Sequence, residues 1–178
     1  TVDRATVLAN QMLALAKVEQ LRQQPATTVV DWASVLRDMA LDVSALIADK
    51  DIDFEISTAP APVRTHEWML RELCRNLLHN AIRHTPAGGT LAVRLVNDAH
   101  HAALVISDSG PGIAVDLRER LFQPFSAGAQ HSGSGLGLAI CSEIVLTLGG
   151  QISLDNRQEH GRITGLDATV RLPLESPT

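Results

Sequence analysis

Apolar residues recur at two spacings along the chain, and each spacing predicts a different kind of element. In residues 1–24 they recur every three or four positions, at Ala5, Leu8, Met12 and Leu15, which predicts an amphipathic helix. Pro25 follows and ends this helix. The same reading predicts further helices over residues 31–49 (with Asp31 as the N-cap), 66–84 and 136–148.

Shorter apolar or alternating segments, separated by glycine, proline and asparagine, predict strands. Strands and helices are intermixed without regular βαβ alternation, so we expect an α/β fold: a two-layer α/β sandwich with a mixed sheet and helices on one face. No later segment is an obvious partner for residues 1–24, so an isolated N-terminal helix is expected, whose stripe another chain could cover. The predicted strands are residues 27–30, 53–57, 63–65, 90–96, 102–107, 151–154 and 168–172.

Composition narrows the classes of protein. Apolar residues make up 45% of the 178 positions but aromatics only 3%, so the core must consist of aliphatic side chains. A net charge of -5 argues against a nucleic-acid surface, and no uncharged apolar run is long enough to span a membrane. Cys74 and Cys141 lie in apolar, helical stretches and are expected to be buried free thiols. The start at Thr1 rather than Met indicates a fragment.

A glycine-rich segment opens the predicted helix 136–148. Glycine lets the backbone approach a ligand, and the free N–H groups of a helix start suit phosphate. The spacing does not fit a dinucleotide-binding fingerprint, and no Gly-Lys-Ser/Thr follows as in a P-loop. A flexible loop is the alternative. The segment reads Gly133-Ser134-Gly135-Leu136-Gly137-Leu138.

A second glycine segment follows the apolar strand 102–107. Asp108 stands at the strand end, beside Gly110 and Gly112. Its carboxylate could accept a hydrogen bond from an amino group on a flat ring, with the glycines giving the ring room. An ordinary turn is the alternative, because these residue types also favour turns.

The helix predicted over residues 66–84 carries polar residues beside its apolar side. Asn76 and Asn80 are four residues apart and share a face. Asparagine is unfavourable within a helix, whereas its amide oxygen is a suitable ligand for Mg²⁺. Arg83 lies one turn further and could meet a phosphate. A solvated polar face is the alternative.

The order of these motifs resembles the sensor histidine kinases of two-component systems. The asparagine helix would be their N box, residues 108–113 the first glycine box, Phe122-Gln123-Pro124-Phe125 the F box, and residues 133–138 the second glycine box. The resemblance covers about residues 27–173. Residues 13–19 are similar to the end of the family's dimerisation hairpin, so residues 1–24 would be the end of a hairpin helix and residues 25–178 the catalytic domain.

The resemblance implies the GHKL ATPase fold, also called the Bergerat fold, with ATP and Mg²⁺ bound. Asn80 would hold Mg²⁺ through the ATP phosphates, and Asp108 would accept from the adenine amino group. Asn76 and Asn80 would be the catalytic residues. The other implied ATP contacts are Asn76, Arg83 and His84 at the phosphates and ribose, Gly110, Gly112 and Ile113 near adenine, Gly133, Gly135, Leu136, Gly137 and Leu138 at the phosphate end of the lid, and Thr169 near adenine.

The implied activity is transfer of the ATP γ-phosphate to a histidine outside this chain, for relay to a response regulator. Residues 1–24 contain no histidine, and His66 opens a helix in the wrong context for a phosphoacceptor. Gyrase-type relatives place a glutamate where Asn76 stands, and an amide cannot act as a general base. The site is therefore expected to hold ATP without hydrolysing it.

The resemblance also implies a homodimeric parent protein, an integral membrane sensor with this domain in the cytoplasm. Residues 126–132 contain no Lys or Arg, unlike the lid of many relatives, which predicts weaker closure on the phosphates. Two other functions stay open: a nucleotide-binding regulatory module without transfer activity, and a serine kinase of the anti-sigma type. The latter group lacks the hairpin helix.

Overall fold

A five-stranded mixed sheet forms one layer of the molecule. The computed structural model describes residues 2–118, 120–124 and 136–176. The strand order is β2-β4-β5-β7-β6, with β2 parallel to β4 and the other neighbours antiparallel. The strands are β2 (Asp53–Ser57), β4 (Thr90–Asn97), β5 (His101–Asp108), β6 (Gln151–Glu159) and β7 (Arg162–Pro173).

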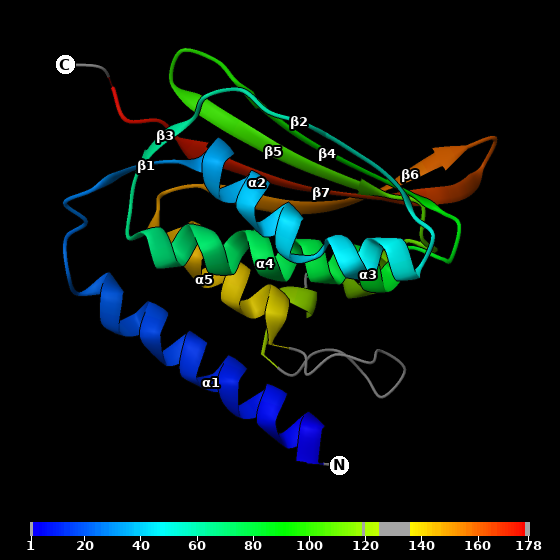
Figure 1. Ribbon diagram of the computed structural model, residues 1–178, viewed down its shortest axis with the longest axis horizontal. Helices are drawn as coiled ribbons and strands as arrows, with labels where there is room; N and C mark the ends of the chain where they lie inside the picture. The colour runs from blue at the N-terminus through cyan, green and yellow to red at the C-terminus, as the bar shows by residue number, and fades with distance from the viewer. Residues whose placement is uncertain (1, 119, 125–135, 177–178) are drawn as a thin grey trace.

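Helices cover one face of this sheet (Figure 1). Burial alternates along the strands: Leu91, Val93 and Leu95 of β4 are buried, whereas the residues between them are more exposed. The expected two-layer α/β sandwich with helices on one face is therefore confirmed. The covering helices are α2 (Trp32–Asp42), α3 (Ser44–Asp49), α4 (Glu67–His84) and α5 (Gly137–Thr147). A separate two-stranded ribbon consists of β1 (Val29–Asp31) and β3 (Pro62–Arg64). Two short 3-10 helices are η1 (Val115–Leu117) and η2 (Arg120–Phe122).

Aliphatic side chains between the two layers form the core. Leu73, Ile140, Leu104 and Val170, from α4, α5, β5 and β7, are all completely buried. The two cysteines, Cys74 and Cys141, are buried in the same core as free thiols, as expected. Burial raises the pKa of Cys74 to about 12, so this thiol stays protonated and unreactive at neutral pH.

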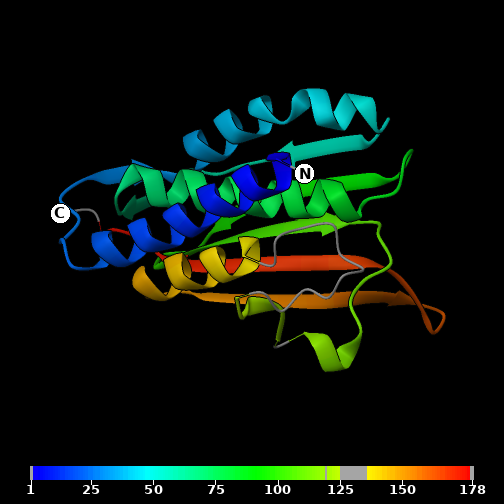
Figure 2. The same ribbon diagram turned by 90° about the horizontal axis from the view of Figure 1, so that it is seen from below.

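The first helix, α1 (Val2–Arg22), packs on the outer side of the helical layer, along α5 (Figure 2). Val18 is only 1% exposed, and Arg22 forms an ion pair with Glu143 of α5. The Nζ atom of Lys17 lies 4.6 Å from the centre of the Trp68 ring of α4. The helix for which the sequence showed no partner thus has one within its own chain. The division of the chain between residues 24 and 25 stays a prediction.

Most element boundaries agree with the prediction within two residues, and two regions differ. The helix expected over residues 31–49 is split at Val43 into α2 and α3, although Asp31 does cap it by accepting from Ala33 N at 3.2 Å. Strands β6 and β7 extend beyond the expected residues 151–154 and 168–172 into a long hairpin. His160 and Gly161, both with positive φ, form its turn. The polar sequence of this hairpin hides it from a search for apolar alternation.

Within the part of the chain that the structure describes, no helix is long and apolar enough to cross a membrane.

Candidate functional site

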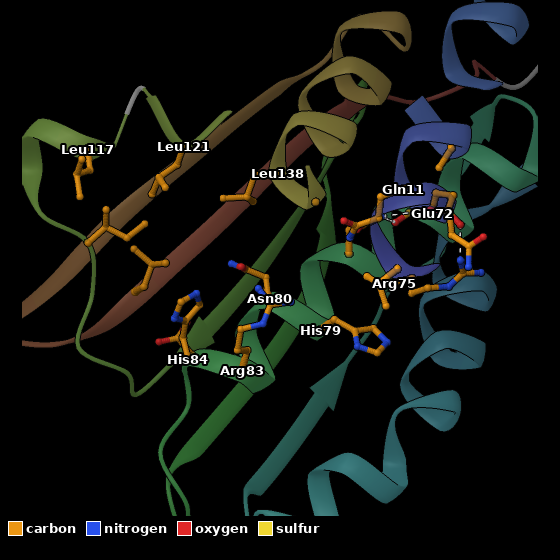
Figure 3. Close-up of a pocket in the computed structure, with 18 of the residues that line it drawn as sticks. Gln11, Glu72, Arg75, His79, Asn80, Arg83, His84, Leu117, Leu121 and Leu138 are labelled. Atoms are coloured by element: carbon orange, nitrogen blue, oxygen red, sulfur yellow. Dashed lines mark hydrogen bonds and ion pairs between the residues drawn. The ribbon is translucent and has the colours of Figure 1, made fainter. Parts of the chain in front are cut away.

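A cleft of about 840 Å³ lies between α4, α5 and the segment that follows β5, with α1 as a further wall. Figure 3 shows Asn80 and His84 of α4 across from Leu117, Leu121 and Leu138. One side of the cleft is therefore polar and the other apolar, as suits a ligand with a charged and a flat part. Of the expected site residues, those that line it are Asn76, Asn80, Arg83, His84, Asp108, Gly112, Ile113, Gly137 and Leu138.

The two asparagines of α4 differ in their surroundings. The Nδ2 atom of Asn76 donates to the backbone oxygen of Glu72 at 2.8 Å and to the Oε2 atom of Glu72 at 3.3 Å. Its Oδ1 atom faces α5, since a Cβ atom on Gly137 would lie 3.2 Å from it. Asn76 thus sits where α4 meets the start of α5, and Asn80 lies one turn closer to Asp108.

The C-terminal end of α4 is capped by a lysine that the sequence analysis did not single out. The Nζ atom of Lys50 donates to the backbone oxygens of Ile82 (2.7 Å), Arg83 (3.2 Å) and Thr85 (2.6 Å). A cation at this position satisfies the last carbonyls of the helix and is favoured by the helix dipole. Lys50 therefore fixes the backbone that carries Arg83 and His84 into the cleft.

Asp108 ends β5 with its side chain on the helix-covered face. It is only 3% exposed, and its Oδ1 atom accepts from Gly110 N at 2.8 Å. Burial raises the pKa of this carboxyl, and the contact with Gly110 and the charge of Arg157 oppose the rise. A Cβ atom on Gly110 would lie 2.4 Å from His84 O, so glycine lets the loop lie directly on the end of α4.

The other end of this loop is fixed by β6. Gly112 has a φ of +75°, a conformation that glycine adopts without strain. Ile113 N donates to the Oδ1 atom of Asn156 at 2.8 Å, and the Nδ2 atom of Asn156 donates to Ile113 O at 2.6 Å. Ile113 and Leu138 are thereby held as apolar lining near the buried Asp108 carboxyl.

The start of α5 forms the third side of the cleft. Gly137 opens the helix, and the N-cap residue, Leu136, makes no side-chain cap hydrogen bond. Such a helix start favours an anion. The side chain of Leu136 is 1% exposed and belongs to the core rather than to the cleft lining. Gly133 and Gly135, together with Phe125 of the expected F box, lie outside the described residues.

One expected contact needs correction. Thr169 lies on β7 between the buried residues Ala168 and Val170, so its side chain is on the face of the sheet that the helices do not cover. It is not among the residues that line the cleft. The β7 residue that does line the cleft is Leu166, which pairs with Asp108. Thr169 was taken from the resemblance, as the late threonine near adenine, but alternation along β7 puts Leu166, Ala168 and Val170 on the helix-covered face instead.

Cationic groups gather along the α4 side of the cleft. Arg75, Arg83 and Lys17 line it, which favours a polyanionic ligand. His79 is not a further cation at neutral pH, because burial and the charges of Arg83 and Arg75 lower its pKa.

The side chains of the cleft fit a magnesium ion that arrives with its ligand. Among the described residues, no group of three or more His, Cys, Asp or Glu side chains could hold a metal by itself. Asn80 offers one amide oxygen beside the cations that favour phosphate. Mg²⁺ is commonly held in this way, by one or two protein oxygens, substrate phosphates and water.

This chain is similar in sequence and in structure to proteins of one known family. The family described as histidine kinase-, DNA gyrase B- and HSP90-like ATPase matches residues 65–176. The sensor protein kinase PmrB of Pseudomonas aeruginosa is 33% identical over 180 residues, covering 99% of this chain and 37% of PmrB. The structure of the mycobacterial sensor histidine kinase MprB is 34% identical with a TM-score of 0.77, covering 84% of this chain and 99% of that one.

A further solved structure, full-length ShkA in complex with AMPPNP, is 25% identical with a TM-score of 0.80. The match covers 96% of this chain and 36% of ShkA. This chain spans about a third of the length of the curated relatives PmrB and CreC. It therefore corresponds to one part of such a sensor kinase.

Proposed function

The chain belongs to the histidine kinase-, DNA gyrase B- and HSP90-like ATPase family, as the catalytic ATP-binding domain of a two-component sensor histidine kinase, and we propose that it holds Mg²⁺–ATP in the cleft between α4, α5 and residues 108–113. In this proposal the γ-phosphate passes to a histidine of the parent kinase that lies outside this chain. From there it passes to an aspartate of a response regulator.

The observation that carries the proposal is the meeting of three distant segments in one cleft: the polar face of α4, the buried Asp108 carboxyl and the start of α5. Asp108 would accept a hydrogen bond from the adenine amino group, with Ile113 and Leu166 against the ring. Asn80 would hold Mg²⁺, which neutralises phosphate charge during transfer. Arg83, His84 and the start of α5 would hold the phosphate and ribose groups; Asn76 would align Asn80 with α5. Phosphoryl transfer depends mainly on such positioning and charge neutralisation.

Transfer is preferred to hydrolysis because, among the residues of α4 that the structure describes, no general base is placed for water. The amide of Asn76 cannot take a proton. The nearest acid along α4, Glu72, is 7% exposed, and its carboxylate contacts Arg75 and Asn76. We therefore expect bound ATP to persist until a nucleophile reaches it.

The first test is calorimetric titration of the chain with AMPPNP, with and without Mg²⁺. The proposal predicts micromolar to sub-millimolar binding that strengthens with Mg²⁺. A folded sample that binds no nucleotide under either condition would contradict it.

The second test distinguishes a histidine kinase from the two other functions, a regulatory module and a serine kinase. The chain is mixed with radiolabelled ATP and the histidine-bearing hairpin of the parent kinase, and the labelled product is treated with acid. We expect an acid-labile phosphohistidine. An acid-stable product would favour a serine kinase of the anti-sigma type. Tight ATP binding with no transfer would favour a regulatory module.

The same proposal covers the oligomeric state and cellular location of the parent protein. The curated relative PmrB is a sensor protein kinase, and we expect the parent of this chain to be a dimeric membrane-anchored sensor with the domain in the cytoplasm. Fractionation of cells expressing the full-length parent, with protease protection of this domain, tests that expectation.

A further inference from the structure

Two consecutive residues of β6, Asn156 and Arg157, contact the two ends of the loop that carries Asp108. Neither residue belongs to the motifs that identify the family in this sequence. They stand in the long β6–β7 hairpin, at the point where the register with β7 shifts after Arg157. Arg157 reaches across β7 to the last residue of β5, whereas Asn156 contacts Ile113 in the loop that follows β5.

Arg157 holds the start of the loop. Its Nη2 atom donates to Asp108 O at 2.6 Å, and its Nη1 atom donates to the Oδ1 atom of Asp167 at 2.6 Å and to Leu166 O at 3.2 Å. The guanidinium reaches β5 because the intervening residue of β7 is Gly165. A Cβ atom at Gly165 would lie 2.2 Å from Arg157 Nη2 and 2.0 Å from Asp108 O.

Asn156 holds the end of the loop. Its side-chain amide accepts from Ile113 N at 2.8 Å and donates to Ile113 O at 2.6 Å, so it pairs with the backbone as a neighbouring strand would. A Cβ atom on Gly112 would lie 2.5 Å from the Oδ1 atom of Asn156, so the glycine is what allows this close approach. Both ends of the loop are thus tied to one strand, β6.

We propose that Asn156 and Arg157 are positioning residues for adenine recognition, which fix the Asp108–Ile113 loop so that the Asp108 carboxyl meets the amino group of the base. This inference rests on the proposed function, in which adenine lies at Asp108. The loop contains Gly110, Pro111 and Gly112, and without its two ties the glycines would admit other backbone conformations. The ties therefore remove an ordering cost that ATP would otherwise meet on binding.

The test compares ATP with inosine triphosphate, which has an oxygen in place of the adenine amino group. Affinities of both nucleotides are measured for the full chain and for Arg157→Met, Arg157→Lys and Asn156→Asp. Arg157→Met should weaken ATP binding about tenfold, the effect of losing one well-made hydrogen bond, and change inosine triphosphate binding less than about twofold, so the preference for adenine collapses. Arg157→Lys keeps a cation and should fall between wild type and Arg157→Met.

A matched control is Arg162→Gln, which removes the same charge from the exposed tip of the same hairpin. It should leave both affinities unchanged. Folding of every variant is checked by circular dichroism; if Arg157→Met does not fold, Asn156→Asp and Arg157→Lys decide the matter. An unchanged ratio of the two affinities in folded variants, or an equal loss for both nucleotides, would overturn the inference.

The same titrations separate this inference from the proposed function. If wild type prefers ATP and Asp108→Asn loses that preference while the β6 variants keep it, only the positioning role fails. If wild type and Asp108→Asn bind both nucleotides equally, the assignment of adenine to Asp108 fails and the positioning role falls with it.

Discussion

At the scale of single residues, the carboxyl of Asp108 lies where burial disfavours its charged form. It is buried, and burial raises its pKa, yet it lines the cleft where a ligand can reach it. A buried charged acid costs stability in the free protein, and the backbone contacts with Gly110 and Leu166 offset only part of that cost, since the pKa stays raised. An adenine amino group could add one more hydrogen bond to this carboxyl.

Replacing Asp108 with alanine should weaken ATP binding by about tenfold to a hundredfold, since a hydrogen bond to a charged group contributes roughly 1.5–3 kcal/mol. Calorimetry on the folded variant measures this. Unchanged affinity would remove Asp108 from the adenine site.

In the protein without a ligand, by contrast, removing the charge of Asp108 should increase the stability of the fold. The folded pKa of Asp108 is raised above its ordinary value of 3.8, so the carboxyl has no cost at pH values below 3.8, where it is protonated in both states. The free-energy cost of burying the charged carboxylate appears as the pH rises to the folded pKa and is constant above it. Asp108→Asn should therefore be more stable than wild type at pH 8, and the gain should shrink towards pH 4 in urea titrations. A gain that grows as the pH falls would reverse the assigned sign.

Asn80 should act through the metal. Asn80→Asp should change how ATP binding depends on Mg²⁺ concentration, because a carboxylate binds the cation more strongly and repels bare phosphate. Titrations at a series of Mg²⁺ concentrations measure this. If metal-free and Mg²⁺–ATP binding fell equally, Asn80 would have no role towards the metal.

The expected site residues lie together in one cleft where a motif coincided with strand or helix periodicity. Asp108, Asn80 and Arg83 line one cleft because each follows from a strand end or a helix face. Thr169 was assigned from the family resemblance and lies on the face of β7 that the helices do not cover. Lys50 and Arg157 reach the site through long side chains across the fold, which no local pattern in the sequence reveals.

At the scale of elements, α4 depends on its C-terminal cap. The Lys50 ammonium contacts two of its last carbonyls and that of its C-cap, Thr85. The loop after β5 rests on the same end through Gly110. Helix end, lysine and loop therefore form one support for the cleft. The sequence predicted the helix itself from its apolar stripe, but the support joins segments that are far apart in the chain.

Lys50→Met should lower the free energy of unfolding by about 1–2 kcal/mol, through lost hydrogen bonds and dipole interaction. Urea denaturation measures this. Lys17→Met, the same change at the other lysine of the chain, removes only the contact with Trp68 and should cost less, about 0.5–1 kcal/mol. Equal effects at the two lysines would contradict a special role for the cap.

At the scale of the whole molecule, α1 and the two-layer sandwich form one packed unit. Val18 is buried with the main core, and Arg22 pairs with α5. The apolar stripe of α1 predicted a helix that must pack on something, but not on what, because the stripe of α5 that receives it reads equally well as core. Residues of α1 also wall the cleft, so movement of this helix would alter the site.

Val18→Ala should lower the free energy of unfolding by about 2 kcal/mol, from lost burial and the cavity that is left. Leu13→Ala on the same helix, at a side chain that is 69% exposed, is the control and should have little effect. Urea denaturation of both variants measures the difference. If Val18→Ala were as mild as the control, α1 would not contribute to the folded unit in solution.

The two edges of the sheet have a consequence for solubility. β2 and β6 each leave one side unpaired within the described structure, and an open strand edge can template pairing with another molecule. Asp53 and Glu55 on β2 and Glu159 on β6 are exposed acids along these edges, whereas Asp155 of β6 is paired with Arg118. Two copies that approached edge to edge would bring like charges together. The sheet should therefore resist aggregation by strand addition even where such domains are held at high local concentration.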